Sequence, residues 1–285
     1  MKFKIAFPGE RGSFTEIAAI EYFGKDHQYV CVPEFIGVFE KVSSGICRYG
    51  IVPIENSSAG SIHQNFDALL ESNLFITGEI MLRIGQCLIA NKGVAKKDIK
   101  KIYSHPAVFP QCKKFLARHP SIEKTALPNT ALAVKKIKDE KLTDAAAIAS
   151  MQAAIDFNMD VLAKNIEDNP WNTTRFIIIS KKTEKPAASP VKTSIVFSTK
   201  NIPGALFKCL GVFALRDIDL LKIESRPVHG VKGFNYLFYL DFAGNITDEA
   251  QKNALNHLQE ITTFFRHLGS YNCGKLALPK YQKRY

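Results

Sequence analysis

Short apolar runs alternate with stretches of helical periodicity along residues 1–180. The runs have the length of buried strands, and between them apolar positions recur about every three to four residues, as on one face of a helix. Strands are expected at residues 3–7, 29–32, 50–54, 80–90, 101–104, 145–149 and 176–179. Helices are expected at residues 15–23, 36–43, 62–70, 110–118, 130–138 and 151–157. This alternation predicts an α/β fold with largely parallel sheets, in which ligands bind beyond the carboxyl ends of strands, often between two lobes.

The pattern changes at residues 182–191, which are charged, contain prolines and show no periodicity, so they are expected to form a linker. The chain beyond it predicts the order βαββαβ, with strands at 193–198, 218–225, 234–242 and 269–273 and helices at 204–215 and 248–265. This order is ferredoxin-like, and the free edges of such a sheet favour pairing with a partner. The predicted organisation is a two-lobed part over 1–181, the linker, a small module over 192–275 and a basic tail over 276–285.

The composition is that of a globular protein with a sizeable core, since 46% of the 285 residues are hydrophobic and 23% are charged. The net charge is +11, but the lysines are scattered over the expected helices. No zinc-finger, basic-zipper or RNA-recognition motif is present. The charge therefore favours a solvated surface that attracts small anionic substrates over one that binds nucleic acid.

The six cysteines, at positions 31, 47, 87, 112, 209 and 273, form no CxxC pair. They indicate free thiols in a reducing compartment. No apolar run approaches the ~20 residues of a membrane-spanning helix, and the strand pattern that begins at Phe3 leaves no room for a signal peptide. A cytoplasmic protein without membrane attachment is expected. The sequence has no metal-ligand or cofactor motif, so neither a metal nor a cofactor is expected.

Two expected strands are followed by polar junctions that contain glycine. The first junction, residues 8–16, includes Gly12 and Ser13 just ahead of a helix, where free backbone N–H groups can hold an anion. A tight turn with a helix cap is the simpler explanation of this junction. The second junction, residues 52–63, contains Glu55, Asn56, Ser57 and Ser58 in succession, which is more than a helix cap needs. That cluster of neutral donors suits the recognition of a carboxylate.

Two further junctions carry side chains that could take part in catalysis. His105 and Cys112 suggest a thiol nucleophile, although a buried cysteine on a helix is the favoured interpretation. At the entrance of the strand 176–179, Thr173, Thr174 and Arg175 add two hydroxyl donors and a fixed positive charge. The alternative for these three residues is a strand edge with a capping arginine.

Taken together in this order, the four junctions resemble the prephenate dehydratase family, which includes the arogenate dehydratases. The phrases that match are Gly9-Glu10-Arg11-Gly12-Ser13-Phe14, Val52-Pro53-Ile54-Glu55-Asn56-Ser57, Ser104-His105-Pro106 with Gln111-Cys112, and Thr174-Arg175-Phe176. The chain after the linker resembles the family's ACT regulatory domain through two phrases, Pro203-Gly204-Ala205-Leu206 and Glu224-Ser225-Arg226-Pro227. The resemblance implies a monofunctional enzyme with a two-lobed catalytic domain similar to periplasmic binding proteins, with parallel and mixed sheets, followed by a ferredoxin-like ACT domain.

The reaction that the resemblance implies is the conversion of prephenate into phenylpyruvate, water and carbon dioxide in L-phenylalanine biosynthesis. It requires no metal and no cofactor. By the resemblance, Thr174 donates a hydrogen bond or a proton to the departing hydroxyl, and Arg175 anchors the side-chain carboxylate. The remaining substrate contacts are expected from Asn56, Ser57, Thr173 and the backbone at Gly12 and Ser13.

Some positions depart from the family pattern. Ala107 stands where glutamine commonly follows His-Pro, and Phe109-Pro110 replace small residues. These departures leave the choice between prephenate and arogenate open, although prephenate is favoured. No chorismate mutase domain is expected, because the first strand follows Met1 directly. An alternative from another class is a solute-binding sensor, which would bind prephenate without converting it.

The ACT domains of the family bind phenylalanine between two copies of the domain. The resemblance therefore implies feedback inhibition by L-phenylalanine and a homo-oligomer, either a dimer or a tetramer, assembled through these domains. The residues expected to bind the effector are Asn201, Gly204, Ala205, Leu206, Glu224, Ser225, Arg226 and Pro227.

Overall fold

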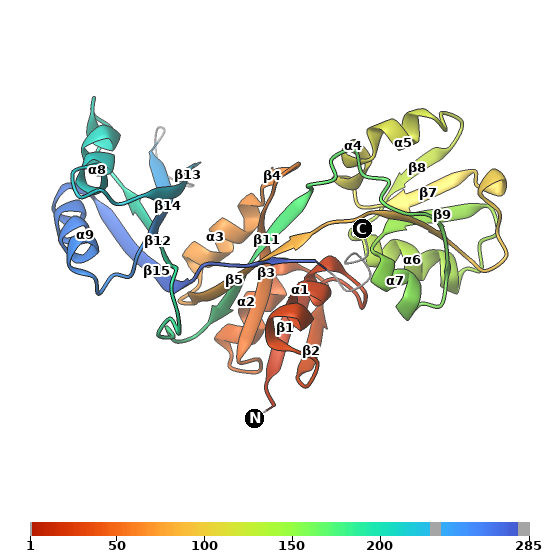
Figure 1. Ribbon diagram of the computed structural model, residues 1–285, viewed down its shortest axis with the longest axis horizontal. Coiled ribbons are helices and arrows are strands. Elements are labelled where there is room, and N and C mark those ends of the chain that lie inside the picture. Colours follow the sequence, from red (N-terminus) through yellow and green to blue (C-terminus); the bar gives the residue numbers. More distant parts are fainter. Residues whose placement is uncertain (1, 229–234, 279–285) are drawn as a thin grey trace. The chain divides into compact units, whose positions relative to one another are not determined.

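The computed structural model describes residues 2–228 and 235–278, and the chain forms two compact units (Figure 1). The large unit holds the residues before Leu74, Ile80–Ile179 and the chain from Lys275 onward. The small unit holds Leu74–Glu79 and Ser180–Gly274. The predicted domain limits run in sequence order. They do not include the exchange of segments between the units, in which Leu74–Glu79 join the small unit and the chain from Lys275 returns to the large unit. In the part of the chain that the structure describes, no helix is both long and apolar enough to cross a membrane.

The first sheet of the large unit has the strand order β16-β5-β11-β3-β1-β2, with β4 paired to β3. Its strands are β1 (Lys4–Pro8), β2 (Gln28–Val32), β3 (Tyr49–Asn56), β4 (Gly60–Ser61), β5 (Phe75–Arg83), β11 (Thr173–Ser180) and β16 (Leu276–Ala277). Strand β1 runs parallel to β2 and β3, and its apolar residues are buried on both faces, as is typical of parallel strands. The accompanying helices are α1 (Phe14–Phe23), α2 (Phe35–Ser43) and α3 (His63–Glu71).

The second sheet of the large unit has the order β10-β6-β9-β7-β8. Its strands are β6 (Cys87–Ala90), β7 (Lys101–Ser104), β8 (Glu123–Ala126), β9 (Ala145–Ala149) and β10 (Asp160–Ala163). Its helices are η1 (Lys96–Asp98), α4 (Val108–Gln111), α5 (Lys113–Ala117), α6 (Thr130–Asp139) and α7 (Met151–Asp156). Strand β7 is parallel to β8 and β9, whereas β6 is antiparallel to β9 and β10. The predicted mixed α/β architecture with parallel and mixed sheets is confirmed.

The two sheets define two lobes, and the chain crosses between the lobes twice, at residues 84–86 and 164–172. The prediction of one strand over residues 80–90 was wrong, because the run is interrupted at residues 84–86 and its halves enter different sheets. The predicted helix 110–118 is likewise two short helices, α4 and α5, with Cys112 between them outside helical geometry.

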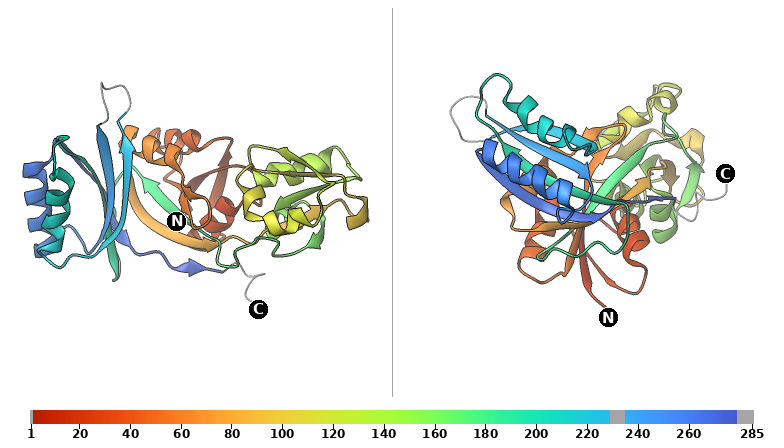
Figure 2. Two further views of the ribbon diagram at one scale, coloured as in Figure 1. Left: turned by 90° about the horizontal axis from the view of Figure 1, so that it is seen from above. Right: turned by 60° about the vertical axis from the view of Figure 1, so that its left-hand side comes forward.

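The small unit contains one antiparallel sheet with the order β13-β14-β12-β15. Its elements are β12 (Val191–Ser198), α8 (Ala205–Ala214), β13 (Leu220–Pro227), β14 (Tyr236–Ala243), α9 (Glu249–Ile261) and β15 (Phe264–Asn272). Figure 2 shows both helices on the same face of the sheet, where they enclose a core that includes Phe197, Phe213 and Phe242. The chain order βαββαβ and this strand order are ferredoxin-like, as predicted.

Two predicted boundaries of the small unit and one of the C-terminal tail differ from those in the structure. The helix expected over residues 248–265 ends at Ile261, because Thr262 is already extended and Phe264 begins strand β15. Strand β14 begins at Tyr236, and Phe234, where the strand was expected to begin, lies outside the described residues. The basic tail predicted for residues 276–285 begins instead with a short strand, β16, and residues 279–285 lie outside the described residues.

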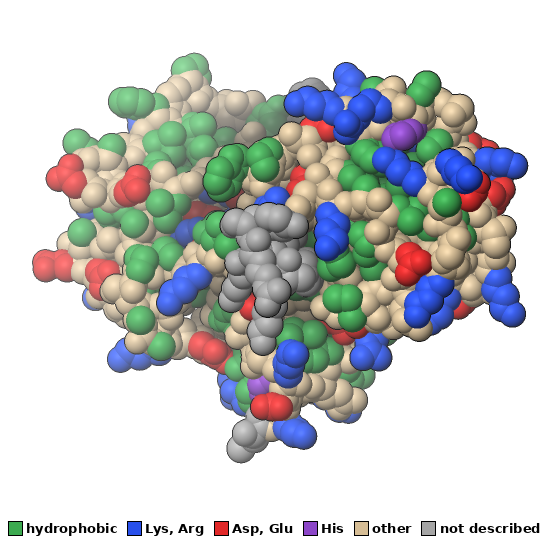
Figure 3. Space-filling view, turned by 45° about the vertical axis from the view of Figure 1, so that its right-hand side comes forward, with side chains coloured by type: hydrophobic (Ala, Val, Ile, Leu, Met, Phe, Trp, Pro, Cys, Tyr) green, Lys and Arg blue, Asp and Glu red, His purple; other side chains and the backbone are tan. Residues whose placement is uncertain are grey.

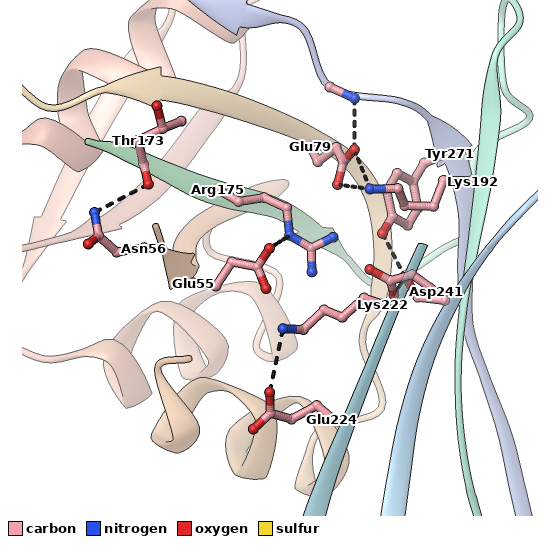
Figure 4. Close-up of polar contacts among 12 residues, drawn as sticks. Glu55, Asn56, Glu79, Thr173, Arg175, Lys192, Lys222, Glu224, Asp241 and Tyr271 are labelled. Carbon is pink, nitrogen blue, oxygen red and sulfur yellow. Dashed lines mark hydrogen bonds and ion pairs between the residues drawn. The ribbon is translucent and has the colours of Figure 1, made fainter. Parts of the chain in front are cut away.

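Strand β5 belongs to both units, with Leu74–Glu79 in the small unit and Ile80 onward in the large unit. In the small unit, the Glu79 carboxylate contacts the Lys192 ammonium at 2.9 Å and accepts the Gly274 N–H at 2.8 Å (Figure 4). Arg266 donates to the carbonyl of Leu74 at 2.9 Å. At Gly269 a Cβ would lie 2.0 Å from the Ile76 carbonyl oxygen, so this approach of the backbones requires glycine. After Gly274 the chain returns to the large unit as β16, parallel to β5.

The positive charge is distributed over the surface. Figure 3 shows Lys and Arg side chains spread over one face of the molecule, among acidic and hydrophobic side chains. This distribution agrees with the expectation drawn from the scattered lysines, and the absence of a nucleic-acid partner stays a prediction.

Candidate active site

The end of β3 meets the start of β11, and this contact brings together four of the predicted substrate-binding and catalytic residues. The backbone N–H of Ser57 donates to the Thr173 carbonyl at 2.8 Å. In return the backbone N–H of Thr173 donates to Oγ of Ser57 at 2.9 Å. Asn56 and Thr174 are the neighbours of this pair on the two strands. Thr173, Thr174 and Arg175 therefore lie within strand β11. The sequence had suggested instead that they precede the strand.

The side-chain amide of Asn56 is the centre of the cluster. Its Oδ1 accepts the backbone N–H groups of Ser58 and Ala59 at 2.9 and 2.8 Å. Its Nδ2 donates to Oγ1 of Thr174 at 2.9 Å and to Oδ1 of Asn172 at 2.7 Å. Figure 4 shows the further contact of Nδ2 with the Thr173 carbonyl, at 3.3 Å. The amide therefore holds the hydroxyl of Thr174, which is only 7% exposed, in a fixed place.

Arg175 does not join this cluster. Successive side chains of a strand point to opposite faces, so Arg175 leaves β11 on the side opposite to Thr174. Its Nε lies 3.4 Å from Oε1 of Glu55, the residue that precedes Asn56 on β3 (Figure 4). The structure thus brings Arg175 to Glu55 and not to the hydroxyl of Thr174. The predicted contact of Arg175 with substrate gains no support from this geometry.

The turn between β1 and α1, which contains Gly12 and Ser13, joins the two lobes. Oγ of Ser13 caps α1 by accepting the N–H of Glu16, and the N–H of Gly12 donates to Oε2 of Glu16 at 2.6 Å. Across the lobes, Ser150 donates to the Gly12 carbonyl at 2.6 Å. The N–H of Ser13 is also engaged, with the carbonyl of Glu10. The N–H groups expected to hold substrate are therefore used within the turn, which is placed to hold the lobes together.

The Glu16 carboxyl is partly buried at this contact between the lobes, and the burial disfavours its charged form. Desolvation raises the pKa of the Glu16 carboxyl above its usual range, and the nearby Asp156 carboxylate acts in the same direction. The Gly12 N–H opposes the rise by favouring the charged form.

A cavity of about 380 Å³ lies beside the Asn56 cluster, between the lobes of the large unit. Its lining comprises Ser58, Ala59, Ala107, Pro110, Gln111, Asp168, Asn169 and Asn172. The polar groups in this lining are amides, one hydroxyl and the Asp168 carboxylate, with no lysine or arginine. Cavities of this size bind small organic molecules. Neutral donors can orient a carboxylate without neutralising its charge.

The cavity is supported by residues to which the sequence gave no role. Gln111 accepts a hydrogen bond from Nδ2 of Asn172 at 2.8 Å, across 61 residues of sequence. Glu167 contacts Arg83 at 3.2 Å and accepts the Gln86 N–H at 2.8 Å. Arg83 also donates to the Pro170 carbonyl at 2.8 Å, so both crossings between the lobes are tied together. Gln111 stands in one of the matched phrases and Asn172 in none of them, and only the fold shows that they meet.

Cys112 is enclosed and does not suit nucleophilic chemistry. It is buried, and burial together with the carboxylates of Glu167 and Asp168 raises the pKa of its thiol to about 12. His105 accepts the N–H of Ala107 on Nδ1, and burial lowers its pKa. Among residues 2–228 and 235–278, no three His, Cys, Asp or Glu side chains are grouped to hold a metal ion.

The folded protein is expected to keep its activity in iodoacetamide at pH 8, because almost none of the Cys112 thiol is ionised at that pH. Cys31, which is exposed, serves as the internal control, since it should be alkylated under the same conditions. Peptide mass spectrometry and a rate assay on one sample decide the matter. Alkylation of Cys112 with parallel loss of activity would restore the thiol hypothesis.

Comparisons with known proteins agree with one another on the family. A family model described as prephenate dehydratase matches residues 5–184. Arogenate dehydratase/prephenate dehydratase 2, a chloroplastic protein of Arabidopsis thaliana, is 43% identical over 277 residues, which cover 94% of this chain and 72% of the relative. The structure of prephenate dehydratase from Arthrobacter aurescens in complex with L-Phe is similar with a TM-score of 0.87 and 32% identity, over 94% of this chain and 90% of that chain.

A structure described as GqqA, a novel type of quorum quenching acylase, is also similar, with a TM-score of 0.84 and 27% identity over 95% of this chain and 98% of that chain. The family model and the more nearly identical relatives decide the assignment. The matched model covers both lobes, including the Asn56 cluster and the cavity. The chain therefore belongs to the prephenate dehydratase family of hydro-lyases.

Proposed function

We propose that the cavity binds prephenate and that the enzyme converts it into phenylpyruvate, water and carbon dioxide. The observation that carries the proposal is the buried Thr174 hydroxyl, held by Asn56 beside a cavity without basic side chains. Prephenate is a cyclohexadiene with a ring carboxylate opposite a hydroxyl. When the C–C bond to the carboxylate breaks, its electron pair enters the ring, and the C–O bond to the hydroxyl breaks as the ring becomes aromatic.

The leaving hydroxyl needs a hydrogen-bond donor, and this need fits Thr174. A threonine hydroxyl is far too weak an acid to protonate a group freely at neutral pH. A donor that is already in place stabilises the charge that develops on the departing oxygen. The hydroxide that leaves becomes water by taking up a proton from solvent. The ring carboxylate must keep its charge until it departs as carbon dioxide. A cavity lined by amides serves this step better than one that forms a salt bridge with that carboxylate.

Arogenate is the second candidate substrate, because it differs from prephenate only by an amino group in place of the keto group. The relatives include enzymes named for both activities. The test is one assay in which the purified protein receives prephenate and arogenate side by side, with and without L-phenylalanine. Turnover of prephenate with the larger kcat/KM supports the proposal. Binding of prephenate without turnover would favour the solute-binding alternative and contradict an enzymatic role.

We also propose that the small unit is an ACT domain that binds L-phenylalanine and assembles the protein into a dimer or tetramer. Strand β13 is an edge of the sheet, and every second residue of it is exposed. On this edge Leu221 and Ile223 are exposed, as is Phe207 on α8. Exposed apolar side chains beside an unpaired edge favour pairing with a second copy. The relative from Arthrobacter aurescens was solved with L-Phe, which supports phenylalanine as the effector.

The residues proposed for the effector lie at the start of α8 and at the end of β13. Gly204 is the N-cap of α8 with a φ of +76°, which places Asn201, Ala205 and Leu206 around the start of the helix. The first N–H groups of a helix suit an amino acid's carboxylate. Glu224, Ser225, Arg226 and Pro227 end strand β13.

The cytoplasmic location expected from the free cysteines stays part of this proposal.

Ile223→Glu is expected to convert the assembled protein to a smaller species and to raise the phenylalanine concentration for half-inhibition at least 10-fold. A carboxylate in a pairing edge is desolvated without a partner, which opposes association. Light scattering and inhibition curves give the two readouts, with basal kcat as a third. Ile36→Glu is the matched control, because Ile36 in the large unit is 47% exposed and Ile223 is 45% exposed. A wild-type monomer that phenylalanine still inhibits would exclude the interface model.

A further inference from the structure

Asn172 is the buried polar residue of the cavity lining, with 1% of its surface exposed. Both ends of its amide are in use. Nδ2 donates to Oε1 of Gln111 at 2.8 Å, and Oδ1 accepts from Nδ2 of Asn56 at 2.7 Å. A primary amide that donates on one side and accepts on the other has one orientation that satisfies both contacts.

The orientation of the Asn56 amide is fixed in the same way. Two backbone N–H groups, from Ser58 and Ala59, point at its Oδ1, so its nitrogen must face Asn172 and Thr174. An amide nitrogen has only hydrogens to give, and the Thr174 oxygen therefore accepts. A hydroxyl that accepts a hydrogen bond from one neighbour still has its own hydrogen for a different acceptor. The hydrogen of Thr174 is thus directed away from Asn56 and is not used by this contact.

We propose that Asn172 is a positioning residue for Thr174, at the centre of a relay of side chains from Gln111 through Asn172 and Asn56 to the Thr174 hydroxyl. The inference rests on the proposed function, in which that hydroxyl donates to the departing oxygen of the substrate. Gln111 belongs to α4 of the second lobe, whereas Asn56 and Thr174 belong to strands of the first. The relay therefore makes the direction of the catalytic hydrogen depend on contact between the lobes.

Loss of the Asn172 amide changes the choice of acceptors around Asn56. The Thr173 carbonyl, already 3.3 Å from Nδ2, becomes the alternative acceptor toward which the Asn56 amide turns. The Thr174 hydroxyl then rotates more freely and presents its hydrogen to the substrate for a smaller fraction of the time. Asn172→Ala is expected to lower kcat roughly 10-fold, which is the rate equivalent of about one neutral hydrogen bond. KM is expected to stay within about twofold, because the effect is on the transition state.

The decisive experiment is a double-mutant cycle with prephenate as substrate. kcat and KM are measured for wild type, Asn172→Ala, Thr174→Ala and the double variant. If Asn172 acts only through Thr174, the double variant matches Thr174→Ala within about twofold. Independent losses that multiply in the double variant would overturn the relay. An inactive wild-type protein would instead overturn the proposed function, so the two failures are distinct.

Two further variants separate positioning from stability. Asn172→Asp keeps the acceptor for Asn56, so its kcat is expected to exceed that of Asn172→Ala, while its negative charge raises KM for an anionic substrate. Asn65→Ala is the matched control, because Asn65 is 0% exposed and its side chain donates to the Pro53 carbonyl outside the cavity. It should lower the urea midpoint without changing the kcat of the folded protein. Equal kcat values for wild type and both Asn172 variants would exclude a positioning role.

Discussion

Thr174→Ala is expected to lower kcat by roughly 10²–10³-fold and to leave KM nearly unchanged. The Thr174 hydroxyl is buried and its oxygen is held at 2.9 Å by Asn56. In the proposed mechanism its hydrogen is donated to the departing hydroxyl of the substrate. A preorganised donor of this kind is worth about 3–4 kcal/mol in the transition state. In the ground state the substrate hydroxyl carries little charge, so the same bond contributes little to KM. The rate of phenylpyruvate formation from prephenate measures both constants.

Two other replacements at this position separate the hydroxyl from the shape of the side chain. Thr174→Ser keeps the hydroxyl and should retain kcat within about 10-fold of wild type, with some loss because serine lacks the methyl group that restricts rotation. Thr174→Val keeps the shape without the hydroxyl and should behave as the alanine variant does. If Thr174→Val turned over substrate at a near-wild-type rate, another group would have to be the leaving-group donor.

Gly12→Ala is expected to lower kcat/KM roughly 100-fold, although Gly12 lies away from the Thr174 hydroxyl. Gly12 has a φ of +78°, and an added Cβ would lie 2.7 Å from Cα of Ala153, which belongs to the helix of the opposite lobe. That distance is shorter than real carbon contacts, so one lobe must move away from the other. The movement also strains the Ser150–Gly12 hydrogen bond. Misplacement of the lobes separates Gln111 from Asn172 and widens the cavity.

Gly45→Ala is the control for this variant, because Gly45 has the same φ of +78° but no atom within 4 Å of the added Cβ. Both variants pay the left-handed backbone strain, about 1–2 kcal/mol of unfolding free energy. Only the Gly12 variant should lose catalytic efficiency. Urea unfolding and kcat/KM are therefore measured together. Equal kcat/KM values for the two variants would show that catalysis does not need this lobe contact.

The sequence predicted the fold class and most elements of the molecule, and its errors have physical causes. Apolar periodicity placed the start of β11 at Phe176, but polar residues extend the strand to Thr173, because the Thr173 backbone pairs with Ser57. Apolar periodicity indicates which side chains are buried, but it does not indicate which backbone groups pair with a neighbouring strand. It also merged β5 and β6, because residues on both sides of a lobe crossing are buried.

The candidate site was predicted less completely than the fold. The ends of β3 and β11 were identified from their polar residues and from the family resemblance, and the structure brings Asn56 and Thr174 together. The predicted contact of Arg175 with substrate stays a prediction, and the alternation of side chains along β11 explains why Arg175 meets Glu55 on the face opposite to Thr174. The contact between Gln111 and Asn172 has no local signal, because it depends on how two lobes meet. The roles of all these residues stay predictions until the variants are measured.

The exchange of segments across the linker limits how the chain can be divided. A chain that stops before Val191 would keep Leu74–Glu79 but lose the residues that contact this segment. These are Lys192 and Gly274, which contact Glu79, and Arg266, which donates to the Leu74 carbonyl. The shortened chain would also lose β16 from the first sheet. The Glu79 carboxylate, which is 4% exposed, would lose its contacts with the Lys192 ammonium and the Gly274 N–H. The piece beyond the linker would in turn lack the strand that its sheet packs against at Gly269. Neither half is thus self-contained, and the small unit cannot be grafted onto another protein, or deleted from this one, by a single cut.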